Sequence, residues 1–196
     1  MTAIKSEIAA NAACLVVEEG LEYGPAKRRA LKNMGLPART PLPDNEAVDV
    51  AVQAYIAVYC AETQAMELDA LRVLAVEWME RLEPFRPHLT GAVWRGTATR
   101  LSDIYIQLFC DDSKSAEIAL IDHRVDYEPR RVPGFHGDTV EALSLRCLCR
   151  PLKEIIGVHL MVYDYDDMRQ APGASKAGQA ARGDLAMVRE LIRNER

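Results

Sequence analysis

The chain has 196 residues, of which 49% are apolar and 27% are charged, with 11 glycines and 10 prolines. This composition is that of an ordinary globular protein, and it excludes a disordered chain, a collagen-like repeat and a small disulfide-held scaffold. Lys and Arg number 24 against 29 for Asp and Glu, so the formal net charge is -5. Such a balance provides no general attraction to nucleic acid or anionic lipid, although a local basic patch could still bind either.

The sequence also indicates a compartment. No stretch reaches the ~18 consecutive apolar residues that a membrane-spanning helix needs. The first residues include Glu7 and have no apolar core, which does not fit a secretory signal. Five cysteines, an odd number, are scattered along the chain, and most lie in apolar runs, where a reduced thiol behaves as a small hydrophobe. We therefore expect a cytoplasmic protein with no membrane partner.

Residues 1–86 predict a section made of helices. Glycines at 20 and 35 are typical helix ends, and Asp44 is a typical N-cap. Each predicted helix has one apolar face, which must pack on another helix or on a partner. The section is therefore also the candidate surface for a protein partner or for self-association. Apolar residues recur at helical spacing near 4–19, 25–34, 45–59 and 68–82.

Residues 87–196 have a different pattern, which predicts a second domain of the α+β class. Alternating apolar and polar residues predict strands near 104–108, 142–148 and 158–163, with an edge strand or extended loop near 125–132. Helices are predicted near 114–123 and from 185 onward, and a loop at 171–183. The expected architecture is an N-terminal helical section followed by a mixed sheet of about four strands with flanking helices.

One segment, from Gly91 to Phe109, carries a pattern that points to a chemistry. It reads GAVWRGTATRLSDIYIQLF. It resembles the signature of the nucleotidyltransferase superfamily, which has the polymerase-β-like fold. In that signature a helix ends in Gly-Ser, a short loop follows, and Ser-Asp-apolar-Asp-apolar opens the next strand. Here Gly96-Thr97 takes the place of Gly-Ser, and Ser102-Asp103-Ile104-Tyr105 takes the place of the acidic strand.

The resemblance implies that a nucleoside triphosphate binds at the mouth of the sheet. Gly96 would let the backbone approach a phosphate, and the Thr97 hydroxyl and the Arg100 guanidinium would contact the phosphate oxygens. Ser102 belongs to the same nucleotide-binding set. Asp103 would be the catalytic carboxylate and the ligand of a Mg²⁺ cofactor.

Tyr105 departs from this signature. A phenol with a pKa of ~10 is neutral at pH 7 and is a poor ligand for a hard divalent cation. The strands predicted at 142–148 and 158–163 carry no acid at their centres, which leaves Glu141 and Asp164, at strand ends, as candidates for a third carboxylate. The sequence therefore favours a nucleotidyltransferase-like domain that binds a nucleotide but is catalytically degenerate.

Two alternatives stay open. The first is an active Mg²⁺-dependent nucleotidyltransferase that acts on a hydroxyl or protein acceptor. The second is a helical interaction protein without enzymatic activity, in which Tyr55, Tyr59 and Trp78 are core or interface residues. A nucleic-acid partner is not expected. His159, in an apolar strand, is interpreted as an interior group with hydrogen-bond partners rather than as a metal ligand.

Overall fold

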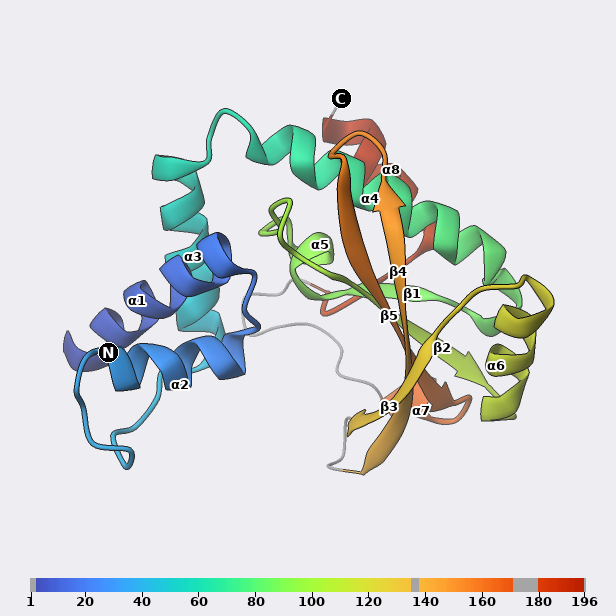
Figure 1. Cartoon of the computed structure of the whole chain (residues 1–196), viewed down its shortest axis with the longest axis horizontal. Helices are drawn as coiled ribbons and strands as arrows, with labels where there is room; N and C mark the ends of the chain where they lie inside the picture. Colours follow the sequence, from blue (N-terminus) through green and yellow to red (C-terminus); the bar gives the residue numbers. More distant parts are fainter. Residues whose placement is uncertain (1–2, 135–137, 171–179, 196) are drawn as a thin grey trace. The chain divides into compact units, whose positions relative to one another are not determined.

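A computed structural model describes residues 3–134, 138–170 and 180–195 (Figure 1). The chain forms two compact units, and each is described by itself. The helical unit contains Met1–Leu68 and Thr97–Ser102, and the sheet unit contains Asp69–Gly96 and Asp103–Arg196. Most of the loop predicted at 171–183 lies outside the described residues.

The element order is helical first and α+β afterwards, as predicted. In the part of the chain that is described, no helix has both the length and the apolar character that crossing a membrane requires. The helices are α1 (Ala3–Glu19), α2 (Tyr23–Asn33), α3 (Asn45–Tyr59), α4 (Gln64–Arg81), α5 (Gly91–Arg95), α6 (Ser113–Asp122), α7 (Asp167–Gln170) and α8 (Leu185–Glu195). The strands are β1 (His88–Thr90), β2 (Ile104–Cys110), β3 (Glu128–Pro133), β4 (Thr139–Cys149), β5 (Glu154–Asp164) and β6 (Gly183–Asp184).

The helical unit is built around α1, whose apolar residues pack against α2 and α3. Ile8 and Ala12 on α1 are fully buried, as are Val48 and Val52 on α3. The predicted cap is confirmed, because the Asp44 carboxylate accepts a hydrogen bond from the Ala47 N–H at 2.8 Å.

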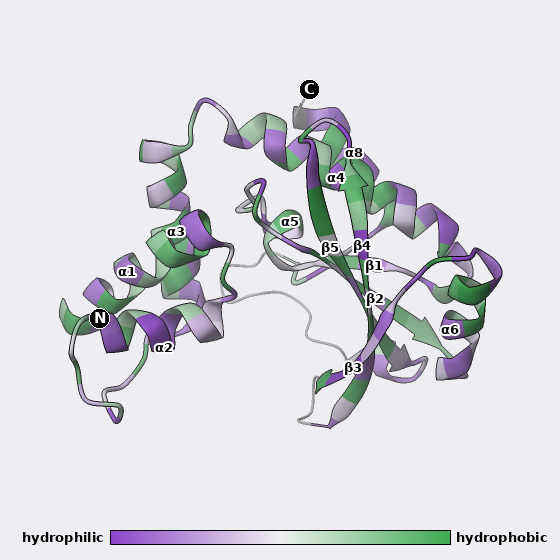
Figure 2. Cartoon of the chain, viewed as in Figure 1, coloured by the Kyte–Doolittle hydropathy of each residue, from purple (hydrophilic) through white to green (hydrophobic). Residues whose placement is uncertain are grey.

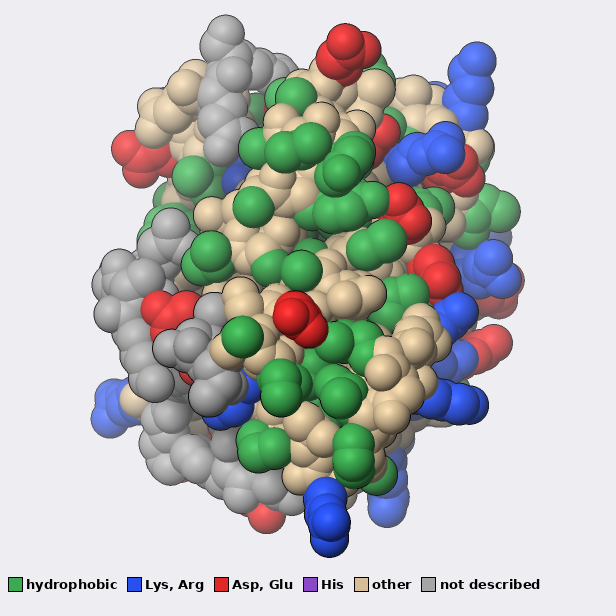
Figure 3. Space-filling model, turned by 90° about the vertical axis from the view of Figure 1, so that its left-hand side faces the viewer, with side chains coloured by type: hydrophobic (Ala, Val, Ile, Leu, Met, Phe, Trp, Pro, Cys, Tyr) green, Lys and Arg blue, Asp and Glu red, His purple; other side chains and the backbone are tan. Residues whose placement is uncertain are grey.

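One face of α3 stays exposed. Val50 and Val58, on this face, are 62% and 70% exposed. Ala54 and Ala57 are also exposed and fall between the two valines on the same side of the helix. Figure 3, seen from the side of this unit, shows hydrophobic side chains gathered on the surface. The chain therefore leaves a strip of small apolar residues on α3 in solvent.

The sheet has six strands in the order β3-β4-β5-β2-β1-β6, rather than about four. Neighbouring strands are antiparallel except β2 and β5, which are parallel, so the sheet is mixed as expected. The extra strands β1 and β6 have three and two residues, which is too short for an alternating pattern to show in the sequence. The segment left open as a strand or loop is the edge strand β3.

One face of the sheet is apolar and packs against α4 and α6. Leu143 and Leu160 are fully buried on that face, and the Cys149 thiol lies 4.0 Å from the Ala70 carbonyl oxygen of α4. Figure 2 shows hydrophobic residues along the central strands and mixed character along α4. Most of α4 belongs to the sheet unit, and the two units divide at Leu68, within this helix. Trp78, one of the three aromatic residues singled out in the sequence, is core at 4% exposure.

Candidate functional site

The segment that carries the sequence signature has the expected local form. Helix α5 ends at Gly96, which has a φ of +83° and lies in the left-handed region that favours glycine. Seven residues later, Asp103 stands immediately before β2. The predicted order of helix, glycine corner, loop and strand is therefore confirmed.

The loop Thr97–Ser102 belongs to the helical unit. Hydrogen bonds of its backbone N–H groups hold it in place. The Ser102 hydroxyl accepts from the Thr99 N–H at 3.0 Å, and the Ser102 N–H donates to the Thr99 carbonyl at 2.8 Å. The Arg100 N–H donates to the Glu67 carboxylate at 2.9 Å. The Thr97 hydroxyl is buried, with no hydrogen-bond partner among the described residues. Ser102 thus closes a turn, and the phosphate contacts expected of Thr97 and Arg100 stay predictions.

Asp103 is held from β5. One carboxylate oxygen accepts from the Gly157 N–H at 3.0 Å, and the other lies 3.1 Å from Nε2 of His159. A Cβ atom at position 157 would lie 2.6 Å from the carboxylate oxygen, so only glycine admits Asp103 this closely. The carboxylate is nevertheless 45% exposed, and a ligand can reach it.

His159 joins Asp103 to Ser144 on β4. Its Nδ1 lies 2.9 Å from the Ser144 hydroxyl, because Ser144 and His159 are direct partners in the antiparallel register. The imidazole is 21% exposed. The interpretation of His159 as a group with hydrogen-bond partners is therefore confirmed. One of these partners, Asp103, is the residue that the signature singles out.

Tyr105 occupies the place of the missing second acid. Its ring stacks on that of His159, with centroids 4.8 Å apart and planes inclined by 26°. The two residues are partners in the parallel β2–β5 register. Tyr105 lies on the same face as Asp103, since side chains two residues apart on a strand point the same way. The second acid position therefore holds an aromatic ring that packs on the imidazole.

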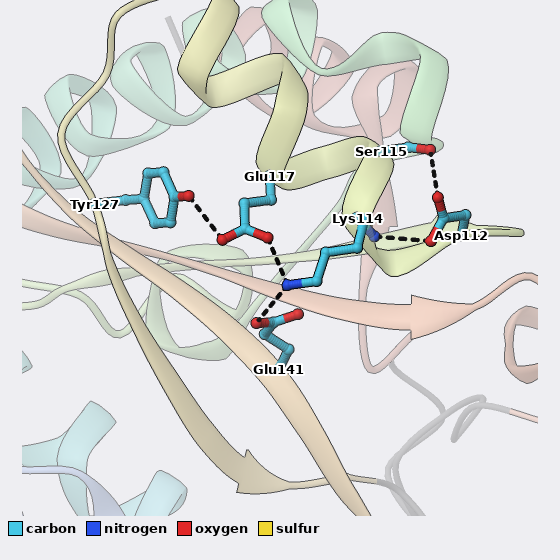
Figure 4. A network of polar contacts seen from close by, with 6 residues as sticks. All are labelled: Asp112, Lys114, Ser115, Glu117, Tyr127 and Glu141. Atoms are coloured by element: carbon cyan, nitrogen blue, oxygen red, sulfur yellow. Dashed lines mark hydrogen bonds and ion pairs between the residues drawn. The ribbon is translucent and has the colours of Figure 1, made fainter.

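The two candidates for a third carboxylate lie on the opposite face. Glu141 pairs with Val162 in the register, on the side covered by α6, and its carboxylate lies 3.8 Å from the Lys114 ammonium (Figure 4). Asp164 pairs with Cys110 at the far end of β2, seven residues from the level of Asp103, which is about 23 Å along a strand. Neither reaches Asp103.

Lys114 is the centre of a polar cluster on α6 that is separate from the site. Its ammonium lies 2.6 Å from the Glu117 carboxylate, which also accepts from the Tyr127 hydroxyl at 2.8 Å (Figure 4). The hydrogen bond from Lys114 is the main reason why the pKa of Glu117 is lowered, and the bond to Glu117 raises the pKa of Tyr127. The cluster links α6 to the segment before β3. Glu141 belongs to this cluster through its ion pair with Lys114.

No group of three or more His, Cys, Asp and Glu side chains among the described residues is arranged to hold a metal ion. Cys147 and Cys149 are free thiols on β4. Asp103 is the one member of the expected acidic set at this point of the sheet. One carboxylate that already has two partners is a poor match for the octahedral oxygen shell of Mg²⁺. The residues therefore do not fit a dedicated Mg²⁺ site.

Comparison of the chain with protein-family models, curated proteins and solved structures gave no significant match. The site therefore has to be interpreted from its own geometry. Ser144 and Gly157 are the functional candidates that sequence reasoning missed. A serine and a glycine inside apolar strands do not indicate a functional site until the register shows which residues lie beside them.

Proposed function

We propose that the protein binds a nucleotide at the end of the sheet where Asp103 stands, and that it does so without a complete metal centre. Two features support this. The glycine corner at Gly96 and the loop to Asp103 have the local form of the nucleotidyltransferase signature. The face beside Asp103 offers the stacked Tyr105–His159 pair, against which a planar base can lie.

The observation that supports a catalytically degenerate domain concerns the second acid position. Tyr105 occupies it, and its ring stacks on His159. Phosphoryl transfer in related chemistry depends on metal ions held by carboxylates. Glu141 and Asp164 lie on the other face, so neither of these two candidates provides Asp103 with a second carboxylate for that purpose. Nucleotide binding in the sheet unit is therefore proposed to rest on Gly96, Asp103 and the Tyr105–His159 pair, with no step routed through Mg²⁺.

Thermal unfolding with ATP, CTP, GTP and UTP, each with Mg²⁺ and with a chelator, tests the proposal. A nucleotide present at 100 times its Kd stabilises the fold by ~2.7 kcal/mol. We expect this stabilisation with at least one nucleotide, and we expect it to survive chelation. Tyr105→Ala should weaken or abolish the shift, whereas Tyr59→Ala, an exposed tyrosine of the helical unit, should leave it intact. Absence of a shift with all four nucleotides would contradict the proposal.

A second candidate function is protein interaction through the helical unit. The observation that favours it is the exposed apolar strip of α3, which includes Val50 and Val58. If the strip is an interface, a Val50→Glu/Val58→Glu double variant should remain folded but lose self-association in light scattering. Wild-type protein that is monomeric at all concentrations would exclude self-association.

A further inference from the structure

Ser144, His159 and Asp103 form a continuous hydrogen-bonded row across three elements of the sheet unit. The Ser144 hydroxyl meets Nδ1 of His159 at 2.9 Å, and Nε2 of the same ring meets the Asp103 carboxylate at 3.1 Å. Asp103 is fixed in turn by the Gly157 N–H. Every member lies on the face opposite to the apolar face that packs on α4 and α6, and both Ser144 and His159 are partly exposed.

The chemistry of the three groups sets the direction of the hydrogen bonds. An ionised carboxylate only accepts, so a neutral His159 donates from Nε2 to Asp103. Nδ1 then carries the lone pair and accepts the Ser144 proton. A serine that donates to an imidazole oriented by a carboxylate has the arrangement of an activated nucleophile. In the serine-protease triad Nε2 faces the serine and Nδ1 faces the aspartate. The two ring nitrogens of His159 have exchanged these roles, and the serine proton still passes to the imidazole.

We propose that Ser144 is a nucleophile that accepts a nucleotidyl group from a bound nucleoside triphosphate, so that the protein modifies itself. This inference rests on the proposed nucleotide binding. The Ser144 oxygen attacks the α-phosphorus, and the new Oγ–P bond replaces the bond from the α-phosphorus to the bridging oxygen. Pyrophosphate leaves, and His159 Nδ1 takes the hydroxyl proton.

Two features of the surroundings favour a phosphorus centre over an acyl group. Ser144 is paired on both sides, with Glu128 on β3 and His159 on β5, so its own backbone N–H is used in the sheet and is not free to act as an oxyanion-hole donor. Arg146 stands two residues from Ser144 on the same face, where its exposed guanidinium suits a phosphate. Glu128, the partner of Ser144 on β3, is ion-paired to Arg130 at 2.9 Å, which reduces its repulsion of an anion.

The first arm of the test measures the nucleophile without a nucleotide. A fluorophosphonate probe forms an Oγ–P bond and releases fluoride, and peptide mass spectrometry locates the product. We expect labelling of Ser144 in the full chain and its loss in Ser144→Ala, while Ser113→Ala, an exposed serine on α6, stays labelled. His159→Ala should slow labelling by about 100-fold or more, and added imidazole should restore part of the rate. Labelling of Ser144 that is insensitive to His159 overturns the inference, as does a Ser144 that the probe leaves unlabelled.

The second arm uses the triphosphates. Intact mass spectrometry after incubation with each nucleotide should show one added nucleoside monophosphate, mapped to Ser144 and lost in Ser144→Ala. Melting temperatures establish that the variants are folded. A thermal shift without an adduct would overturn the inference and leave the proposed nucleotide binding standing. Ser144 labelled by the fluorophosphonate, with neither a thermal shift nor an adduct, would overturn both the nucleotide binding and the transfer.

Discussion

Gly157 and Asp103 fit each other closely: the Gly157 N–H donates to the Asp103 carboxylate at 3.0 Å, and a Cβ at 157 would lie 2.6 Å from the same oxygen. The residue before β2 is thereby held by the backbone of β5. This contact places the carboxylate against His159, and the site depends on it.

We expect Gly157→Ala to expel the Asp103 side chain and to break its two hydrogen bonds, which lowers the free energy of unfolding by about 1–2 kcal/mol. In an Asp103→Ala background the added methyl meets no carboxylate, so the same change should be close to neutral. A double-mutant cycle by urea unfolding measures this coupling. Gly24→Ala, where the new Cβ would meet only ordinary contacts near 3.6 Å, is the control. Equal costs of Gly157→Ala in the two backgrounds would show that the contact is unimportant.

Tyr105→Asp should restore a second carboxylate beside Asp103, because residues two apart on a strand share a face. We expect calorimetry to detect Mg²⁺ binding in this variant and not in the wild type. Tyr105→Asn removes the same ring from His159 without adding charge, and it should bind no Mg²⁺. Nucleotidyl transfer to an acceptor other than Ser144, gained by Tyr105→Asp, would support a degenerate ancestry. A variant that is folded but does not bind Mg²⁺ would contradict the placement of the second acid.

Asp112 caps α6 through a 3.0 Å hydrogen bond from the Lys114 N–H. Replacing it with alanine should cost about 1 kcal/mol in the free energy of unfolding, and Asp112→Asn should retain most of the stability. The neighbouring Asp111→Ala is the control, with an expected effect within about 0.5 kcal/mol. Circular dichroism during urea unfolding provides the measurement. A larger cost at Asp111 than at Asp112 would refute the assignment of the cap.

Burial lowers the pKa of His88 below its ordinary value of 6.5, so the folded state binds the proton more weakly than the unfolded state. The stabilising effect of neutral His88 is complete above about pH 6.5 and decreases as the pH falls below it. We expect His88→Gln to flatten this part of the stability–pH curve. His123→Gln, at an exposed histidine directly after α6, is the control. Identical stability–pH curves for His88→Gln and the wild type would rule out His88 as the source of the loss of stability at low pH.

Local patterns in the chain were sufficient to predict much of the secondary structure. Asp44 and Asp112 begin helices because their carboxylates satisfy free N–H groups within a few residues. The Gly96 corner and the start of β2 also follow from neighbouring residues. Strands β1 and β6 could not be predicted, because two or three residues form a strand only where a neighbouring strand is present to pair with them.

The sequence by itself determined that Asp103 stands at the start of a strand and that Tyr105 shares its face, since both follow from the period of two along β2. Only the tertiary structure decided which groups surround them. The pairing of β4, β5 and β2 brings Ser144, His159 and Gly157 to Asp103 from positions 41 to 56 residues away in the chain, and the same register turns Glu141 to the opposite face. A shift of one residue in the register would exchange the two faces, and it is the burial of the apolar face of each strand in the folded sheet that excludes such a shift.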